Sequence, residues 1–280
     1  AAGPGRQEMS IEILELAAIL AAAGVVAGLL AGLLGVGGGI VLVPVLDLAF
    51  GAAGVPDHLR MHLAVGTSLA SIIPTALSSA RAHRRRDAID ASVARTWSVG
   101  VAIGATLGAV IAALVRGAVL SAVFGVVAVL VGLRMLGGDG GGNAPDRLPG
   151  KPKWLPIPLG IGTISAMMGI GGGTLSVPAL TALGVPVHRA VGTSSWLGFW
   201  IAVPAAIGFA WLGRGLDGLP PFSIGYVSLV ALAVLLPVTV LAAPWGAKIA
   251  HGLTRRQLAV AFGLFLLLTG GRMLYRSLSH

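Results

Sequence analysis

The sequence predicts an all-α polytopic membrane protein built from two homologous halves, and three observations carry this prediction. Hydrophobic residues make up 56% of the 280 residues and charged residues only 10%, against about 25% charged residues in a typical soluble domain. Several apolar runs approach or exceed the roughly 20 residues with which a helix spans a bilayer. One glycine-rich segment also occurs twice. The apolar runs are residues 11–34, 63–80, 97–115, 119–136, 190–212, 224–245 and 258–268.

Composition limits the classes of function. The chain has no cysteine, which excludes disulfides and thiolate chemistry, and we expect neither a metal nor a cofactor. The net charge of +9 would suit a nucleic-acid-binding protein, but the cations lie in short loops between apolar runs. Orientation of a membrane protein by its basic loops explains that distribution better, so the expected partner is the lipid bilayer and not nucleic acid. The first apolar run follows acidic residues, a poor start for a signal peptide, and is expected to be retained.

A short glycine-rich segment, here called a glycine break, interrupts an apolar stretch in each half. The first break is residues 35–39 (Gly-Val-Gly-Gly-Gly) and the second is residues 169–173 (Gly-Ile-Gly-Gly-Gly), with Pro44 and Pro178 following at the same spacing. Each glycine costs a helix about 1 kcal/mol, and backbone released from a helix cannot face lipid. Each break therefore predicts a bent helical hairpin that lines protein or a water-filled cavity. The alternative is that these glycines only let helices pack closely, as we expect for Gly24, Gly28, Gly32, Gly104 and Gly108.

Other unusual residues recur in the same order. The segment His-x-Ala-Val-Gly-Thr-Ser occurs at residues 62–68 and 188–194, Asp90 aligns with Asp217, and Arg134 aligns with Arg272. We therefore predict a first transmembrane repeat (residues 1–136), a basic Gly/Pro-rich linker (137–153) and a second transmembrane repeat (154–280). Each repeat is expected to hold one glycine-broken hairpin and three transmembrane helices.

The basic loops predict how the halves are oriented. Loop 81–95 holds five arginines, and we place it and the linker in the cytoplasm. In the second half the positive charge lies one loop later, as expected if the halves are inverted repeats. The carboxy-terminal Arg272 and Arg276 would then lie outside, against the rule, and Asp47 and Asp57 have no evident partners in the second half.

The two breaks together predict an anion-binding site. Helices that restart after the breaks would point N–H groups and positive dipole ends into a cavity, and interruptions at matching places in two halves indicate a transporter's substrate site. Neutral hydroxyls near the start of the following helices could complete the shell, or could bond their own helix. The candidate substrate-binding residues are Gly37, Gly38, Gly39, Thr67, Ser68, Gly171, Gly172, Gly173, Thr193 and Ser194.

Two duplicated histidines, His62 and His188, are candidates for carrying a coupling proton or attracting an anion, since histidine titrates near neutral pH. They could equally be interfacial or capping residues. Asp90 and Asp217, at the ends of loops, are predicted first as helix caps.

These paired glycine breaks, their prolines and the paired His-x-Ala-Val-Gly-Thr-Ser segments resemble the sulfite exporter TauE/SafE family, also called the 4-toluene sulfonate uptake permease family. The resemblance covers both halves. It implies a transporter in the bacterial inner membrane that carries a sulfur-containing anion such as sulfite, thiosulfate or an organosulfonate.

The leading hypothesis is a secondary transporter, by default an exporter, that works by alternating access with the anion held at the paired breaks near the midplane. An inside-negative potential favours export by about 2.3 kcal/mol per charge per 100 mV. The alternatives are an anion channel, or an importer of another small anion, with the same broken segments. An enzyme is not expected, because the apolar runs contain almost no acid–base or metal-ligand pairs. Transport could be coupled to a proton, and the protein could form an oligomer.

Overall fold

The computed structural model describes residues 4–34, 39–137, 156–252 and 254–279. Within these ranges the chain forms ten helices and one small β-hairpin. The first half contains α1 (Pro4–Leu34), α2 (Gly39–Ala52), α3 (Asp57–Arg84), α4 (Ala91–Leu114) and α5 (Gly117–Leu136). The second half contains α6 (Pro156–Met168), α7 (Gly173–Ala182), α8 (Val187–Leu212), β1 (Ser223–Ile224), β2 (Val227–Ser228), α9 (Leu229–His251) and α10 (Arg255–Leu278).

Six of the described helices are long and apolar enough to cross a membrane, namely α3, α4, α5, α8 and most of α9 and α10. Shorter apolar helices flank the breaks: residues 14–30 of α1, then α2 and α6. This confirms an all-α, multi-pass membrane protein. The expected apolar run 224–245 becomes helical only at Leu229, because residues 223–228 turn back in the β-hairpin.

The hairpins end in the same way in both halves. Gly54 and Gly184 take positive φ angles of 76° and 85°, which glycine adopts without steric cost. The following N–H groups close matching turns, from Val55 to the Phe50 carbonyl (2.9 Å) and from Val185 to the Leu180 carbonyl (3.0 Å). Such a glycine forms a carboxy-terminal helix cap, in which carbonyl groups of the last helical turn accept hydrogen bonds from the N–H groups that follow. It brings the chain to a proline and the next helix after a very short connection.

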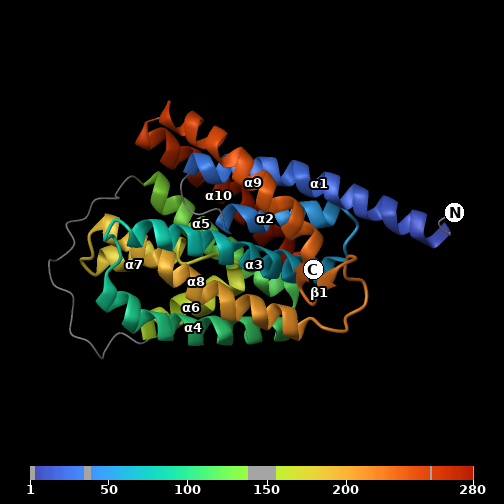
Figure 1. The fold of residues 1–280 in the computed structure, drawn as a ribbon, viewed down its shortest axis with the longest axis horizontal. Helices are drawn as coiled ribbons and strands as arrows, with labels where there is room; N and C mark the ends of the chain where they lie inside the picture. Colours follow the sequence, from blue (N-terminus) through green and yellow to red (C-terminus); the bar gives the residue numbers. More distant parts are fainter. Residues whose placement is uncertain (1–3, 35–38, 138–155, 253, 280) are drawn as a thin grey trace.

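The helix packing is reciprocal between the halves. Helix α1 packs on α9 and α6 packs on α4, while α3 packs on α8 and α5 packs on α10. Figure 1 shows α1, α9 and α10 along one side of the molecule and α4, α6 and α8 along the other, with α3 between them. Exchanging the halves turns the α1–α9 pair into the α6–α4 pair and turns each of the other two pairs into itself. The expected linker residues 138–153 lie outside the described residues.

Glycines permit several of these contacts, as expected for residues 24, 28, 104 and 108. A Cβ built on Gly28 would lie 2.8 Å from the Thr239 carbonyl of α9, and one on Gly104 would overlap the Leu159 carbonyl of α6. Between α5 and α10, Gly125 lies against Gly270 and Gly132 against Gly263. The earlier glycine of α5 lies against the later glycine of α10, and the later one against the earlier one. The two helices therefore run antiparallel, which is the arrangement that inverted halves require. The orientation of each half in a membrane stays a prediction.

A buried ion cluster fixes α2 to the carboxy-terminal helix. Asp47 is 2% exposed, and the Arg276 guanidinium lies 2.8 Å and 2.9 Å from its two carboxylate oxygens. Arg272 approaches the same carboxylate at 3.5 Å, and Arg276 also bonds Asp57 at 3.0 Å. The expectation that Asp47 and Asp57 lack partners in the second half is therefore wrong. These ion pairs also explain why two arginines stand at the carboxyl end against the charge bias.

Replacing Asp47 with asparagine should destabilise the protein. The substitution leaves Arg272 without its counter-charge and leaves Arg276 with Asp57 alone. Removing one partner of a fully buried ion pair costs about 3 kcal/mol or more, and we expect a smaller loss here because Asp57 remains. Tryptophan fluorescence during thermal unfolding in detergent should show a clear drop in Tm. Asp217→Asn, at an exposed aspartate outside this cluster, is the matched control and should leave Tm unchanged. Equal Tm values for the two variants would contradict the account of the cluster.

Candidate functional site

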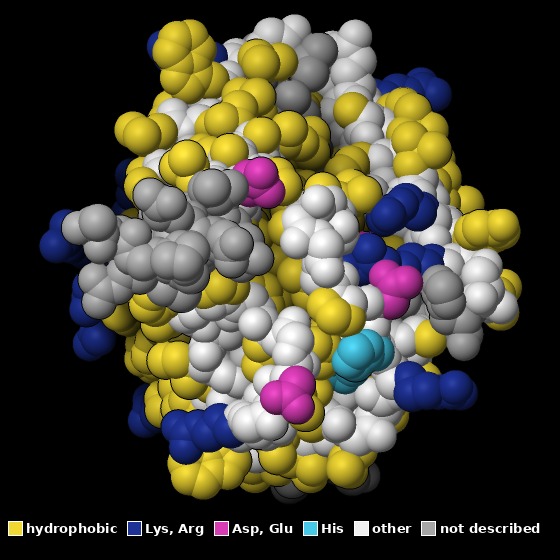
Figure 2. Space-filling view, turned by 90° about the vertical axis from the view of Figure 1, so that its right-hand side faces the viewer, with side chains coloured by type: hydrophobic (Ala, Val, Ile, Leu, Met, Phe, Trp, Pro, Cys, Tyr) yellow, Lys and Arg dark blue, Asp and Glu magenta, His cyan; other side chains and the backbone are white. Residues whose placement is uncertain are grey.

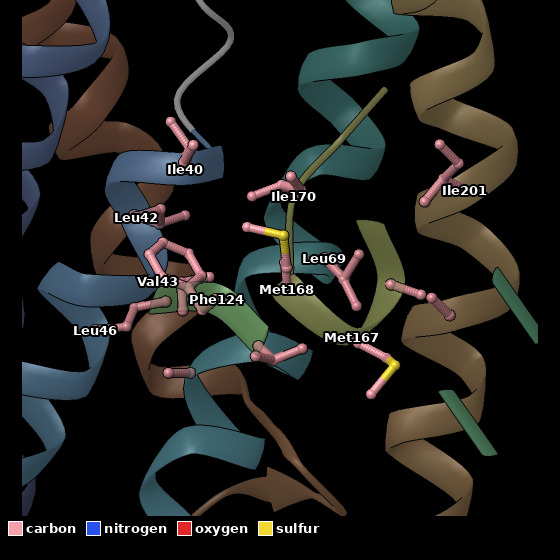
Figure 3. Packing of buried hydrophobic residues seen from close by; sticks show 14 of the residues in the cluster. Ile40, Leu42, Val43, Leu46, Leu69, Phe124, Met167, Met168, Ile170 and Ile201 are labelled. Atoms are coloured by element: carbon pink, nitrogen blue, oxygen red, sulfur yellow. The ribbon is translucent and has the colours of Figure 1, made fainter. Parts of the chain in front are cut away.

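The second glycine break is a tight turn between α6 and α7. Helix α6 ends where Gly169 takes a φ of +68° and the Ile170 N–H donates to the Ser165 carbonyl at 3.0 Å. A Cβ at Gly169 would lie 2.7 Å from a methyl of Val43 and 2.9 Å from the Val65 Cα. Only glycine satisfies both the left-handed backbone and this close approach. Figure 3 shows Met168 and Ile170 between Leu42 and Val43 of α2 on one side and Ile201 of α8 on the other.

The two breaks meet. Gly39, the last residue of the first break and the first of α2, lies against the second break: its built Cβ would be 3.2 Å from the Gly171 nitrogen and 3.2 Å from the Ile170 Cα. Ile72 of α3 contacts both glycines. The amino-terminal ends of α2 and α7 are therefore neighbours in the interior. Gly37 and Gly38 lie outside the described residues.

Polar groups around the second break have unused hydrogen-bonding capacity. Among the described residues, the N–H groups of Gly171 and Gly172 donate to no acceptor. Two serines flank the break, Ser165 before it and Ser176 after it, and both hydroxyls are fully buried with no partner in the described part of the chain. Buried polar groups normally find partners, so these unpaired groups on both sides of the break make it a candidate ligand site. Gly173 begins α7 and completes this amino-terminal turn.

Sequence reasoning missed the two serines. Ser165 and Ser176 occupy the positions that correspond to Ala31 and Leu42 in the first half. The signal was present, because a hydroxyl replaces an apolar residue on each side of the second break. A search for residues that recur in both halves does not find these two serines, because each occurs in one half only.

The predicted serines Ser68 and Ser194 bond backbone carbonyls. The Ser68 hydroxyl donates to the Gly169 carbonyl at 2.7 Å, across 101 residues of sequence. The Ser194 hydroxyl donates to the Val191 carbonyl of its own helix at 2.8 Å, and a Cβ at Gly172 would lie 2.5 Å from the Ser194 carbonyl oxygen. Ser68 therefore anchors the turn of the second break, and Ser194 contributes its backbone to the wall on which Gly172 packs.

The predicted threonines Thr67 and Thr193 join the two halves. The Thr67 hydroxyl of α3 accepts the Ser228 N–H just before α9 at 3.0 Å. The Thr193 hydroxyl of α8 accepts the Asp90 N–H just before α4 at 2.9 Å. Both threonines are fully buried. Each threonine thus binds the first turn of a helix in the opposite half.

The glycine before each threonine has a matching role. Gly66 lies against the Tyr226 carbonyl and Gly192 against the Ala88 carbonyl, both so close that a Cβ would overlap the oxygen. Because Ser228 and not Asp217 occupies the place equivalent to Asp90, the alignment of Asp217 with Asp90 is wrong. The β-hairpin that follows α8 accounts for the shift.

Asp90 caps α4, as predicted. Its carboxylate accepts the N–H groups of Ser92 (3.0 Å) and Val93 (3.1 Å). Partial burial raises the pKa of this carboxyl, but the hydrogen bonds from the Ser92 side chain and from both N–H groups outweigh burial and hold the pKa below its usual value. Ser228 caps α9 in the same way through its hydroxyl, which accepts the Ala231 N–H at 3.2 Å. Asp217 is exposed and caps no described helix.

The two predicted histidines differ. His62 is 4% exposed; its Nε2 lies 2.9 Å from the Ala112 carbonyl and 3.1 Å from the Val115 carbonyl at the end of α4, and its ring stacks on Tyr226. Burial raises the pKa of the Tyr226 hydroxyl. His188 is exposed. His62 lines a pocket of about 490 Å³ at the end of the molecule, where Figure 2 shows histidine, arginine and acidic side chains close together.

Comparison with known proteins identifies the family. The model of the family "Sulfite exporter TauE/SafE" matches residues 20–273. The chain belongs to this family. A TauE/SafE chain is a membrane transporter, and the match covers both glycine breaks. No solved structure matches the chain.

Curated relatives of this TauE/SafE protein carry similar names. A "Probable membrane transporter protein" of Haemophilus influenzae is 28% identical over 244 residues, which is 85% of this chain and 90% of the relative. A probable membrane transporter protein of Methanocaldococcus jannaschii is 26% identical, over 93% of this chain and 99% of the relative. The Bacillus subtilis protein YunE, also named a probable membrane transporter, is 25% identical over 93% and 98% of the two chains.

The threonine contacts predict a loss of stability on substitution. Thr67→Val removes the acceptor of the buried Ser228 N–H, and leaving such a group unsatisfied costs about 1–3 kcal/mol. Thr193→Val should act in the same way through Asp90, whereas Thr→Ser at either position keeps the hydroxyl and should restore most of the stability. Thermal unfolding in detergent measures the difference. Valine variants as stable as their serine counterparts would show that these bonds do not hold the halves together.

Proposed function

We propose that this TauE/SafE protein is a secondary transporter that exports a small sulfur-containing anion, such as sulfite, thiosulfate or an organosulfonate, by alternating access. The anion is held between the two glycine breaks. The observation that carries the proposal is the contact of Gly39 with Gly171, because it joins two helix amino-terminal ends at one place. Such ends attract anions through free N–H groups and the positive end of the helix dipole.

The donor set suits an oxyanion that must also be released. The N–H groups of Gly171 and Gly172 and the hydroxyls of Ser165 and Ser176, which have no partner among the described residues, are neutral donors. Oxyanions with several acceptor oxygens can engage such donors together, while the absence of a fixed cation in that set keeps binding reversible. Ser68, Thr67, Thr193 and Ser194 act in this scheme by positioning the breaks and the helices around them.

The buried charges support export more than sodium-driven uptake. Asp47 is the sole buried carboxylate among the described residues, and its oxygens face arginines. No carboxylate of the described core is thus available for sodium, whereas an inside-negative potential alone drives an anion outward by about 2.3 kcal/mol per charge per 100 mV. The buried His62 is the group best placed to carry a coupling proton if one is needed. The exposed His188 has no comparable environment.

Anion efflux from proteoliposomes tests the proposal by comparing two glycine-to-alanine variants. Gly171→Ala adds a methyl group 3.2 Å from the Cγ2 methyl of Ile72, a contact that a shift of a few tenths of an ångström relieves, and we expect it to obstruct access to the N–H groups of the break. We expect efflux of labelled sulfite or thiosulfate to fall about tenfold or more, equivalent to about 1.4 kcal/mol. Gly160→Ala, on α6 with nothing within 4 Å of the added Cβ, should leave flux unchanged.

Thermal unfolding must give equal Tm values for both variants, so that lost flux reports the site and not misfolding. Unchanged efflux in a well-folded Gly171→Ala protein would remove the second break from the transport site. An anion channel, the alternative, would show single-channel currents and no counterflow. A carrier shows saturable flux that an anion on the opposite side accelerates.

A further inference from the structure

A groove of about 760 Å³ opens on the side of the molecule between α4 and α8, away from the glycine breaks. Its walls are mainly apolar. Val99 and Ile103 of α4 are 59% and 49% exposed, and Trp200 of α8 is 39% exposed. Both helices are long and apolar enough to span a membrane, so these exposed apolar side chains suit a surface that faces lipid.

The groove has a fixed direction. Arg95, Val99 and Ile103 are spaced by four residues and lie on one face of α4, as Trp196 and Trp200 do on α8. With a rise of 1.5 Å per residue, the apolar floor extends about 12 Å from Arg95 to Ile103. Arg84, Asp87 and Arg95 line the same groove at the loop end. One end is therefore charged and the other is apolar.

The charged end has unbalanced positive charge. Neither Arg84 nor Arg95 forms an ion pair with any described residue, and the one hydrogen bond of the Arg95 side chain goes from Nε to the Ala91 carbonyl at 3.3 Å. Asp87 is exposed and offers one carboxylate. A hydrogen bond fixes the orientation of the Trp196 ring in the groove wall beside these residues: its indole N–H donates to the Ser98 hydroxyl at 3.0 Å.

We propose that this groove binds an anionic phospholipid, with phosphatidylglycerol as the model ligand. Its phosphate lies between the guanidinium groups of Arg84 and Arg95, since arginine pairs well with phosphate oxygens. One acyl chain lies along Val99, Ile103 and Trp200. Basic pockets between transmembrane helices are known places for anionic headgroups. The Asp87 carboxylate can accept a hydrogen bond from the glycerol hydroxyls of this headgroup, which a bare phosphate lacks.

Binding here would act on the transport site through α8. Trp196 and Trp200 occupy the groove side of α8, while the Ser194 carbonyl and Gly198 of the same helix contact Gly172 of the second break. A lipid in the groove would therefore support α8 on the side opposite the break. The proposal concerns lipid binding and does not depend on which anion is transported.

Native mass spectrometry of the purified protein with added phosphatidylglycerol tests this site. The double variant Arg84→Gln/Arg95→Gln should retain about tenfold less lipid, as expected when two basic residues beside an anionic headgroup are lost. Arg85→Gln/Arg86→Gln is the matched control, with the same charge change at nearby residues that do not line the groove, and should retain lipid within about twofold of the parent. Ile103→Trp fills the apolar floor without a charge change and should also lower retention.

Three results would overturn the proposal. Equal losses in the two double variants would indicate a general basic surface. Equal retention of phosphatidylcholine and phosphatidylglycerol by the parent protein would indicate annular lipid only. Displacement of the bound lipid by millimolar inorganic phosphate would indicate a headgroup site with no contribution from the acyl chain. Thermal unfolding in lipid-free detergent should match for all variants, which separates lipid loss from misfolding.

Discussion

Backbone N–H groups that leave a helix inside a membrane protein need partners, because lipid supplies none. The glycine breaks place such N–H groups in the interior of the molecule, where the surrounding helices must pack around them. The second break is stabilised by Ser68 from α3 and by close packing on α8, and Gly39 brings the first break against it. The groups at Gly171, Gly172, Ser165 and Ser176 have no partner among the described residues. In this account an anion with several oxygens satisfies them.

The surrounding helices hold the breaks in place through contacts that cross between the halves. Thr67 binds the start of α9 and Thr193 binds the start of α4, so each half stabilises a helix start in the other. The Asp47 cluster adds a third tie, from α2 to α10. A motion that opens one side of the breaks must therefore change the packing between the halves as well as these polar contacts.

Much of the fold was predictable from the sequence, because length, hydropathy and glycine placement are local signals. The all-α multi-pass class, the six long helices and the close packing at Gly28 and Gly104 follow from them. Side-chain partners were not predictable. Thr67 and Thr193 are predicted near the substrate, and no local pattern indicated that their hydroxyls accept N–H groups more than 100 residues away. Asp47 seemed unpaired because its arginines lie at the other end of the chain.

The central claim is that the two breaks share one anion. Diffraction from crystals soaked with selenite, a heavier analogue of sulfite with a strong anomalous signal, tests it most directly. The account predicts an anomalous peak within hydrogen-bonding distance of the Gly171 and Gly172 N–H groups and beside Gly39. A peak found only at surface arginines or at the Asp47 cluster, with the breaks empty at saturating selenite, would contradict it.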